Sequence, residues 1–318
     1  MLFAFLNTRG WNEEKWRTLI KEGEEYDVIG VGETGWHDSI EWHEGDWVGI
    51  GVGRSVGEKK GGGVGVIMKE KGDRRITEVQ KVKDMKTNLG FIRGDILTVK
   101  ITEGREEWWV TVVYMGVEGR ENYDNNRKLY DLMIEIKKEV GDRKWIIMGD
   151  LNGHTGLNSD RVNGNGKMIL DFVEQTRMKM KNWELEDPIT WRDRGAESAI
   201  DYIIINDKVE KYGCGIWKNE QVDISDHILI GITCGKTKQQ KKVVKSGWRE
   251  KWKTNNVDWV KYREKLDEQM FDEIDKRDRT INDWEKDIKK KILNEANRSV
   301  GTQKFKIGKT KLKRLVGQ

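Results

Sequence analysis

The stretch WIIMGDLNGHTG, residues 145–156, and the stretch SAIDYIIIN, residues 198–206, carry the clearest structural signal in the chain. Each contains an apolar run rich in Ile, which predicts a β-strand. An acidic side chain stands at the edge of each run, Asp150 in the first and Asp201 in the second. The two segments therefore predict rigid strands that deliver carboxylates to the rim of a sheet.

Similar apolar runs recur along the first three quarters of the chain, interleaved with amphipathic stretches. The predicted strands span residues 2–7, 26–33, 63–68, 96–102, 108–115, 145–150, 199–206 and 228–234. The predicted helices span residues 12–22, with Asn12 as N-cap, 124–140 and 166–178. Strands mixed with a few helices favour a layered α/β domain in which sheets pack between helices.

The composition indicates a folded protein. The 318 residues include 15 Trp, and the hydrophobic fraction is 36% before the 35 Gly are added, which argues against wholesale disorder. Because no apolar run reaches the roughly 18 residues of a membrane span and the start lacks a signal-peptide pattern, we expect a soluble, intracellular protein. Cys214 and Cys234 match neither a disulfide framework nor a metal-binding pair.

The charge is distributed unevenly. Residues 1–235 carry 34 basic and 42 acidic side chains, a net charge of −8, whereas residues 236–318 carry 25 and 13, a net charge of +12. The basic part begins with a polar linker and continues with helical periodicity over about 259–274 and 281–292. We therefore predict a domain over 1–235 and a basic, mainly helical extension over 236–318, which is either a solvated charge run or a nucleic-acid contact.

Polar side chains stand at the edges of the predicted strands. They are Asn7, Glu33, Asp150, Asn152, Asp201, Ser225, Asp226 and His227. This set offers oxygen ligands and one imidazole but no thiolate, which suits Mg²⁺ or Mn²⁺ and argues against structural zinc. A divalent metal beside a His/Asp pair indicates phosphoryl chemistry, although each short motif alone also fits an ordinary polar turn.

The ordered motifs resemble a known superfamily. They are Asn7, GETGW (32–36), GGGVGVIM (61–68), VVYMG (112–116), IIMGDLNGHTG (146–156), TW (190–191), SAIDYIIIN (198–206) and ISDH (224–227). Together they resemble the endonuclease/exonuclease/phosphatase superfamily, and most of all the endonuclease domain of LINE-type (non-LTR) retrotransposons. The resemblance implies a four-layer α/β sandwich of two mixed sheets flanked by helices.

The resemblance also implies roles for individual residues. Glu33 would be the principal Mg²⁺ ligand, helped by Asn7, with Asp226 near or on the metal. Asp150 would orient or deprotonate the attacking water, and His227, oriented by Asp201, would act at the scissile phosphate. In the same way, Tyr114 and Asn152 would contact the phosphate, and Thr190, Ser198 and Ser225 would line the DNA-backbone cleft.

The segment 191–199 falls where such endonucleases carry a hairpin that probes a DNA groove. Arg192 and Arg194 would then be minor-groove residues, because Arg is attracted to narrow grooves. A polar turn that happens to carry two Arg is the competing interpretation.

The implied function is Mg²⁺-dependent nicking of double-stranded DNA that leaves a 3′-hydroxyl for a reverse transcriptase, although this chain has no reverse-transcriptase motif. The implied protein is a nuclear monomer without membrane contacts, whose basic extension could also bind element RNA. Two alternatives remain. One is another phosphodiesterase of the superfamily, such as an abasic-site nuclease or an inositol phosphatase, and the other is a non-catalytic, host-retained binding module.

Overall fold

Two β-sheets lie face to face in the first of the two compact units of the chain, Met1–Lys238 and Gln239–Gln318. The computed structural model describes residues 1–22, 25–54, 61–88, 94–157, 161–235, 248–252, 257–271, 288, 290–292, 294–296, 298–300 and 302–306.

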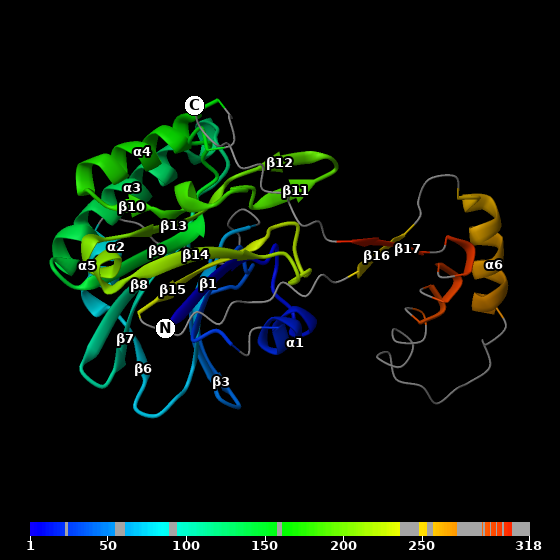
Figure 1. Cartoon of the computed structure of the whole chain (residues 1–318), viewed down its shortest axis with the longest axis horizontal. Coiled ribbons are helices and arrows are strands. Elements are labelled where there is room, and N and C mark those ends of the chain that lie inside the picture. The colour runs from blue at the N-terminus through cyan, green and yellow to red at the C-terminus, as the bar shows by residue number, and fades with distance from the viewer. Residues whose placement is uncertain are drawn as a thin grey trace, which may run out of the picture. The chain divides into compact units, whose positions relative to one another are not determined.

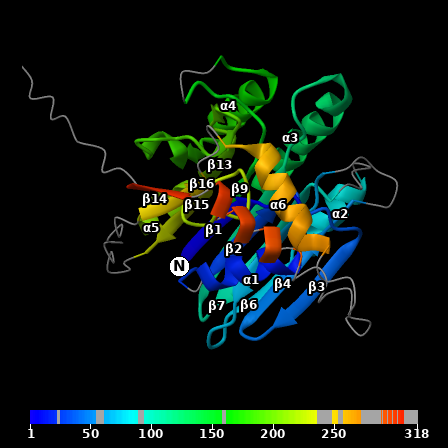
Figure 2. The ribbon, with the colours of Figure 1, turned by 90° about the vertical axis from the view of Figure 1, so that its right-hand side faces the viewer.

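The first sheet has seven strands, in which β1 and β2 are parallel and the other neighbours are antiparallel. In spatial order they are β14 (Cys214–Asn219), β15 (Leu229–Cys234), β1 (Leu2–Asn7), β2 (Val28–Gly32), β5 (Val64–Lys69), β4 (Trp47–Val52) and β3 (Ser39–Glu44). Figure 2 shows β1, β2, β4 and β3 following one another across this sheet.

The second sheet has six strands, in which β8 and β9 are parallel and the other neighbours are antiparallel. In spatial order they are β10 (Lys179–Met180), β13 (Asp201–Ile205), β9 (Lys144–Asp150), β8 (Glu106–Tyr114), β7 (Ile96–Glu103) and β6 (Arg75–Glu78). Both sheets are therefore mixed.

Helices cover the outer faces of both sheets (Figure 1). The outer face of the six-stranded sheet packs against α2 (Gln80–Asn88), α3 (Arg120–Val140) and α4 (Gly164–Thr176), and that of the seven-stranded sheet packs against α1 (Glu13–Glu22). Shorter helices are α5 (Asp207–Tyr212) and the 3₁₀ turn at Lys181–Glu184. The unit is a four-layer α/β sandwich, as the resemblance implies.

The main core lies between the two sheets. Phe3 and Phe5 of the first sheet meet Val112 and Met148 of the second, and all four are fully buried. Gly30 allows this close approach, because a Cβ there would lie 2.8 Å from Met148 Sδ and Val112 Cγ2. Strands buried on both faces read as continuous apolar runs, which explains why sequence alone located them.

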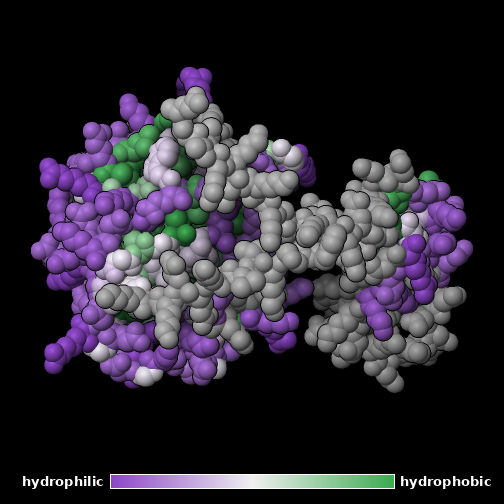
Figure 3. Space-filling view, in the orientation of Figure 1, coloured by the Kyte–Doolittle hydropathy of each residue, from purple (hydrophilic) through white to green (hydrophobic). Residues whose placement is uncertain are grey.

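Every predicted strand and helix of the first unit is present, within a few residues of its predicted bounds. Asn12 caps α1, since its Oδ1 accepts from Lys15 N at 2.9 Å. The sequence did not predict β3, β4, β6, β10, β14, α2 or α5; except in β4, whose residues are apolar, these segments are less uniformly apolar. Much of the first unit's described surface is hydrophilic in the view of Figure 3, with hydrophobic side chains in patches.

The second unit contains a helix and a strand pair within its described part. The helix α6 spans Trp259–Phe271, inside the predicted 259–274, and residues 290–292 and 294–296 are also helical. Most of the predicted 281–292 helix lies outside the described residues. The strands β16 (Trp248–Trp252) and β17 (Thr302–Lys306) pair antiparallel, which the sequence did not predict. Among the described residues, no helix has the length and apolar character that a membrane crossing requires.

Candidate active site

The site forms where strand ends from both sheets meet. Asn7 ends β1 and Glu33 follows β2, and these strands run parallel, so both side chains lie at one edge. In the other sheet Asp150 ends β9 directly opposite Asp201, the first residue of the antiparallel β13. His227 lies just before β15, the antiparallel neighbour of β1, which brings it to the same rim.

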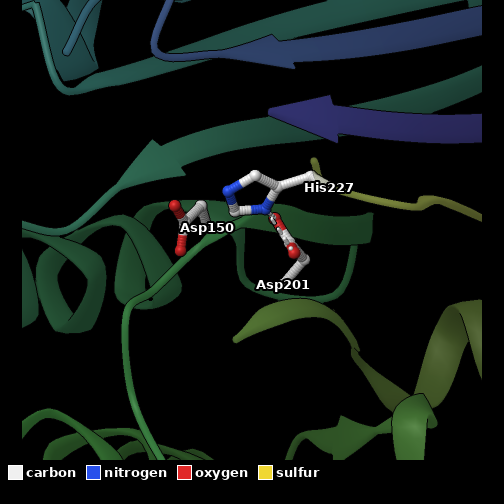
Figure 4. A group of neighbouring side chains, drawn as sticks. All are labelled: Asp150, Asp201 and His227. Atoms are coloured by element: carbon white, nitrogen blue, oxygen red, sulfur yellow. Dashed lines mark hydrogen bonds and ion pairs between the residues drawn. The ribbon is translucent and has the colours of Figure 1, made fainter. Parts of the chain in front are cut away.

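Asp201 and His227 form a buried pair. His227 Nδ1 lies 2.8 Å from Asp201 Oδ2 and 3.1 Å from Oδ1, and the two side chains are 4% and 1% exposed. The His227 ring lies between the Asp201 and Asp150 carboxylates, with its second nitrogen on the Asp150 side (Figure 4). Because Nδ1 is held by Asp201, Nε2 is the atom that can serve a substrate.

Asp150 and His227 both have shifted pKa values. Burial, reinforced by the negative charge of Asp201, raises the pKa of Asp150 to about 7. Burial lowers the pKa of His227, but the charge and hydrogen bond of Asp201 outweigh it and raise that pKa to about 9. Near neutral pH the site therefore pairs a carboxylate that can accept a proton with a protonated imidazole.

Asn7 connects two of the carboxylates. Its Nδ2 donates to Glu33 Oε2 at 3.0 Å and to Asp150 Oδ2 at 2.8 Å, while its Oδ1 accepts from Arg9 N at 2.9 Å. Two carboxylate oxygens that converge on one donor group are placed to share a cation, and hard oxygen ligands suit Mg²⁺ or Mn²⁺.

A second group could also hold a metal. Ligand atoms of Asp150, Asp201 and His227 lie within 4.8 Å of one another. We favour the Glu33/Asp150 edge as the metal position, because Asp201 and His227 Nδ1 are already engaged with each other. In either arrangement Asp150 is a ligand, so these residues can hold a divalent metal.

Tyr114 stands beside Glu33. A Cβ on Gly61 would lie 3.3 Å from Glu33 Oε1 and 3.6 Å from Tyr114 Oη, so both groups border the same glycine, whose φ of +90° suits glycine. Burial, together with the charges of Glu33 and Asp150, raises the pKa of Tyr114. Its hydroxyl therefore stays protonated and can donate a hydrogen bond. Glu33 has a backbone φ of 49°, in the left-handed region that residues with a Cβ seldom adopt.

Asn152 is fixed by its neighbours. Its φ is 43°, its N–H donates to Asp150 Oδ1 at 3.0 Å, and its Nδ2 donates to Met115 O at 2.8 Å. Asn165 Nδ2 donates to Asn152 O at 3.0 Å. This bonding leaves the second N–H of the Asn152 amide for the predicted phosphate contact.

Asp226 is already engaged by protein groups. It forms an ion pair with Arg9 and accepts from Trp191 Nε1 at 2.8 Å and from Ser225 Oγ at 3.3 Å. Burial works against ionisation, but the Trp191 hydrogen bond, His227 and Arg9 hold the pKa of this carboxyl below its usual range. Asp226 thus anchors protein side chains, and its place near or on the metal stays a prediction.

The predicted cleft residues divide into two groups. Thr190 is fully buried, and its Oγ1 accepts from Ile200 N at 3.1 Å and Asp201 N at 3.0 Å. The prediction that Thr190 lines the DNA cleft does not fit this burial, because the hydroxyl holds the strand that carries Asp201. Ser225 and Ser198 are both partly exposed at the rim.

The segment 191–199 forms the predicted hairpin. Its strands are β11 (Trp191–Asp193) and β12 (Ala196–Ser198). Arg192 is held by ion pairs with Asp187, Glu197 and Glu220, whereas the Arg194 side chain at the turn is 94% exposed. Arg194 is therefore better placed than Arg192 to reach a DNA groove.

Sequence reasoning missed several supporting residues. Arg54 forms a bidentate ion pair with Asp95, in which Nε donates to Oδ1 and Nη2 donates to Oδ2, both at 2.9 Å. Its Cζ lies 5.7 Å from the centroid of the Tyr114 ring. Asn182 donates to Asp201 O at 2.9 Å. These residues sit in segments without a recognisable motif, so only the folded structure connects them to the site.

A family model described as endonuclease-reverse transcriptase matches residues 110–231, which include Tyr114, Asp150, Asp201 and His227. A search of curated proteins found no match.

Solved structures share the fold. The endonuclease domain of TRAS1, a telomere-specific non-LTR retrotransposon, matches with a TM-score of 0.56 and 13% identity, over 74% of this chain and 97% of that one. The AP endonuclease LMAP from Leishmania major matches with a TM-score of 0.54 and 14% identity, over 73% and 86%. The catalytic domain of Xenopus laevis APE2 matches with a TM-score of 0.55 and 16% identity, over 74% and 91%. Residues 110–231 therefore match an endonuclease-reverse transcriptase family model, and the first unit shares its fold with these solved endonucleases.

Proposed function

We propose that this chain is a Mg²⁺-dependent DNA endonuclease that nicks one strand and leaves a 3′-hydroxyl, as target-primed reverse transcription requires. The observation that carries the proposal is the buried Asp201/His227 pair beside Asp150, with Glu33 and Asn7 at the same rim. An acid/base pair next to a metal position lined by oxygen ligands is an arrangement that can catalyse phosphodiester hydrolysis.

Each residue of the site has its own role in the proposed phosphodiester hydrolysis. A metal at Glu33 and Asp150 would neutralise charge on the phosphate. Asp150, whose pKa in the metal-free site is raised to about 7, orients the attacking water and accepts its proton. His227, with its pKa raised to about 9, is protonated at neutral pH, so it stabilises charge on the phosphate or donates a proton to the leaving oxygen. Asp201 holds the ring, and Tyr114 and Asn152 donate to phosphate oxygens.

We extend the proposal to the partners. Double-stranded DNA is the substrate, in the nucleus of a eukaryotic host. The net +12 of residues 236–318 supplies non-specific phosphate attraction that the acidic first unit lacks by net charge, and it could also hold element RNA.

Nicking of supercoiled plasmid tests the proposal. The purified chain should convert plasmid to open circle with Mg²⁺ but not with EDTA, and a polymerase should extend the nicked end. H227A should abolish nicking, whereas H43A should not, since His43 is an exposed histidine whose side chain pairs with Glu70. Intact plasmid with folded, metal-loaded wild type would reject the proposal.

Parallel substrates separate the alternatives. An abasic-site duplex and an inositol phosphate are offered under the same conditions. Cleavage of the abasic duplex alone would favour an abasic-site nuclease, and release of phosphate from the inositol substrate alone would favour a phosphatase. Binding of DNA without any cleavage would favour a non-catalytic module.

A further inference from the structure

Arg9 has a backbone conformation that its residue type seldom adopts. Its φ is 46°, in the left-handed region that side chains with a Cβ disfavour. Strained residues of this kind persist only where the surrounding structure holds them, and they concentrate at functional sites. The position of Arg9, two residues after Asn7, places it at the candidate active site.

The turn around Arg9 is held from several directions. Arg9 N donates to Asn7 Oδ1 at 2.9 Å, and Gly10 N donates to Glu33 O at 2.7 Å. The ammonium of Lys15 donates to Gly10 O at 3.0 Å, to Arg9 O at 3.3 Å and to Thr8 O. The conformation of Arg9 is therefore built into the site and ties its backbone to both Asn7 and Glu33.

The guanidinium of Arg9 is anchored at one end and exposed at the other. One terminal nitrogen pairs with Asp226, whose side chain is 15% exposed, while the Arg9 side chain is 55% exposed. A guanidinium carries five N–H donors in a rigid fork. Asp226 thus fixes where the group lies and leaves further donors of the exposed guanidinium beside the site.

The charges around the site show what these donors could bind. Glu33, Asp150, Asp201 and Asp226 put four carboxylates at the rim where a phosphodiester must approach, and that approach needs compensating positive charge. A guanidinium is always charged and its fork matches two phosphate oxygens.

We propose that Arg9 is a DNA-phosphate ligand of this site, anchored by Asp226, which binds non-bridging oxygens of a phosphate at or beside the scissile bond. The inference rests on the proposed endonuclease function and adds a substrate-positioning residue to it. Arg9 acts on binding of the strand, so its loss raises KM and the DNA dissociation constant more than it lowers kcat.

Two variants isolate the guanidinium. R9G removes it but keeps the turn, because glycine adopts the left-handed conformation without strain. R9K keeps a positive charge but loses the fork. R17A is the matched control, since Arg17 is an exposed arginine on α1 that pairs with Glu13. Thermal melts confirm that all variants are folded.

The measurement is binding of a short duplex in EDTA over a range of KCl concentrations. Wild type should bind, R9G should lose roughly tenfold in affinity, and its log–log salt slope should fall by about 0.9, the value for one lost phosphate contact. R9K should restore most of the slope but only part of the affinity. R17A should match wild type.

A neutral methylphosphonate moved along the strand locates the phosphate. At the contacted position it should weaken wild type but hardly affect R9G, because the two changes remove the same interaction. If wild type binds and R9G shows the same affinity and slope, Arg9 only holds Asp226 and this inference is wrong. If wild type binds no duplex in EDTA but nicks plasmid with Mg²⁺, the Arg9 inference alone is wrong; if it does neither, the endonuclease proposal fails with it.

Discussion

The side-chain amide of Asn7 lies 2.8 Å from Asp150 Oδ2, and this hydrogen bond joins strand ends that belong to two different sheets. The same nitrogen donates to Glu33 at 3.0 Å. The packing of the two sheets, rather than either sheet alone, therefore sets the spacing of the carboxylates that face the metal position.

Replacing Asn7 should weaken metal use. N7A leaves the Glu33 and Asp150 carboxylates without their shared donor and removes a group that orients them, so the Mg²⁺ concentration for half-maximal nicking should rise by roughly 10–100-fold. The control is N12A, which removes only the N-cap of α1. N12A should lower the melting temperature and leave the Mg²⁺ dependence unchanged. An unchanged Mg²⁺ dependence in N7A would show that the metal binds elsewhere.

The pH–rate profile should be bell-shaped. Activity should rise with pH as Asp150 ionises, at a pH below its metal-free pKa of about 7 because a bound divalent metal favours the carboxylate, and fall as His227 loses its proton through its pKa of about 9. Removing the negative charge of Asp201 lowers both pKa values, because that charge disfavours the Asp150 anion and favours the imidazolium. D201N should therefore move both limbs of kcat/KM to lower pH. If the alkaline limb of the D201N profile coincided with that of wild type, a group other than His227 would control that limb.

D150N should be inactive but more stable than wild type in EDTA. The folded-state pKa of Asp150 is about 7, whereas the ordinary pKa of an aspartate is 3.8, so the folded state binds more protons between these values. Wild-type stability therefore falls as pH rises from about 4 to 7 and is then level. The D150N advantage should grow through this window to about 2–4 kcal/mol. Urea denaturation at pH 4 and pH 8 measures the free energy of unfolding of both proteins. If D150N exceeded wild type by the same amount at both pH values, the buried-carboxylate explanation would be contradicted.

The buried Arg54–Asp95 pair should be needed for stability. Their side chains are 9% and 0% exposed, so R54A leaves a buried carboxylate without its partner, which costs about 3–5 kcal/mol. R17A breaks an exposed pair and should cost at most about 0.5 kcal/mol. Chemical denaturation compares the two. Because Arg54 also lies over the Tyr114 ring, R54K, which keeps a positive charge beside Asp95, should be used to separate lost nicking from lost stability.

The two arginines of the 191–199 hairpin should behave differently. Arg194 is almost fully exposed at the turn, so R194A should change DNA affinity or the distribution of nick sites without changing the melting temperature. Arg192 is held by three acidic residues, so R192A should loosen the hairpin and lower the melting temperature slightly. Sequencing of nick positions and thermal melts provide the comparison. Identical nick patterns and affinities for R194A and wild type would favour the polar-turn interpretation.

Sequence reasoning located the strands that are buried on both faces, because β1, β9 and β13 are continuous apolar runs. It missed β3, whose residues alternate between exposed and half-buried, and the β16/β17 pair, whose strands lie about fifty residues apart. Local pattern cannot specify pairing over such a distance, since the partner strand supplies the hydrogen bonds that define it.

The sequence by itself determined the identities and order of the polar residues at the strand ends, and with them the oxygen-rich ligand set and the Asp/His pairing that the superfamily resemblance implies. Only the tertiary structure decided which atoms meet. It placed Thr190 under Asp201 instead of toward DNA, engaged Asp226 with Arg9 and Trp191, and shifted the pKa values of Asp150 and His227. The physical reason is that burial and through-space charge depend on neighbours far apart in the chain, which residue order alone does not bring together.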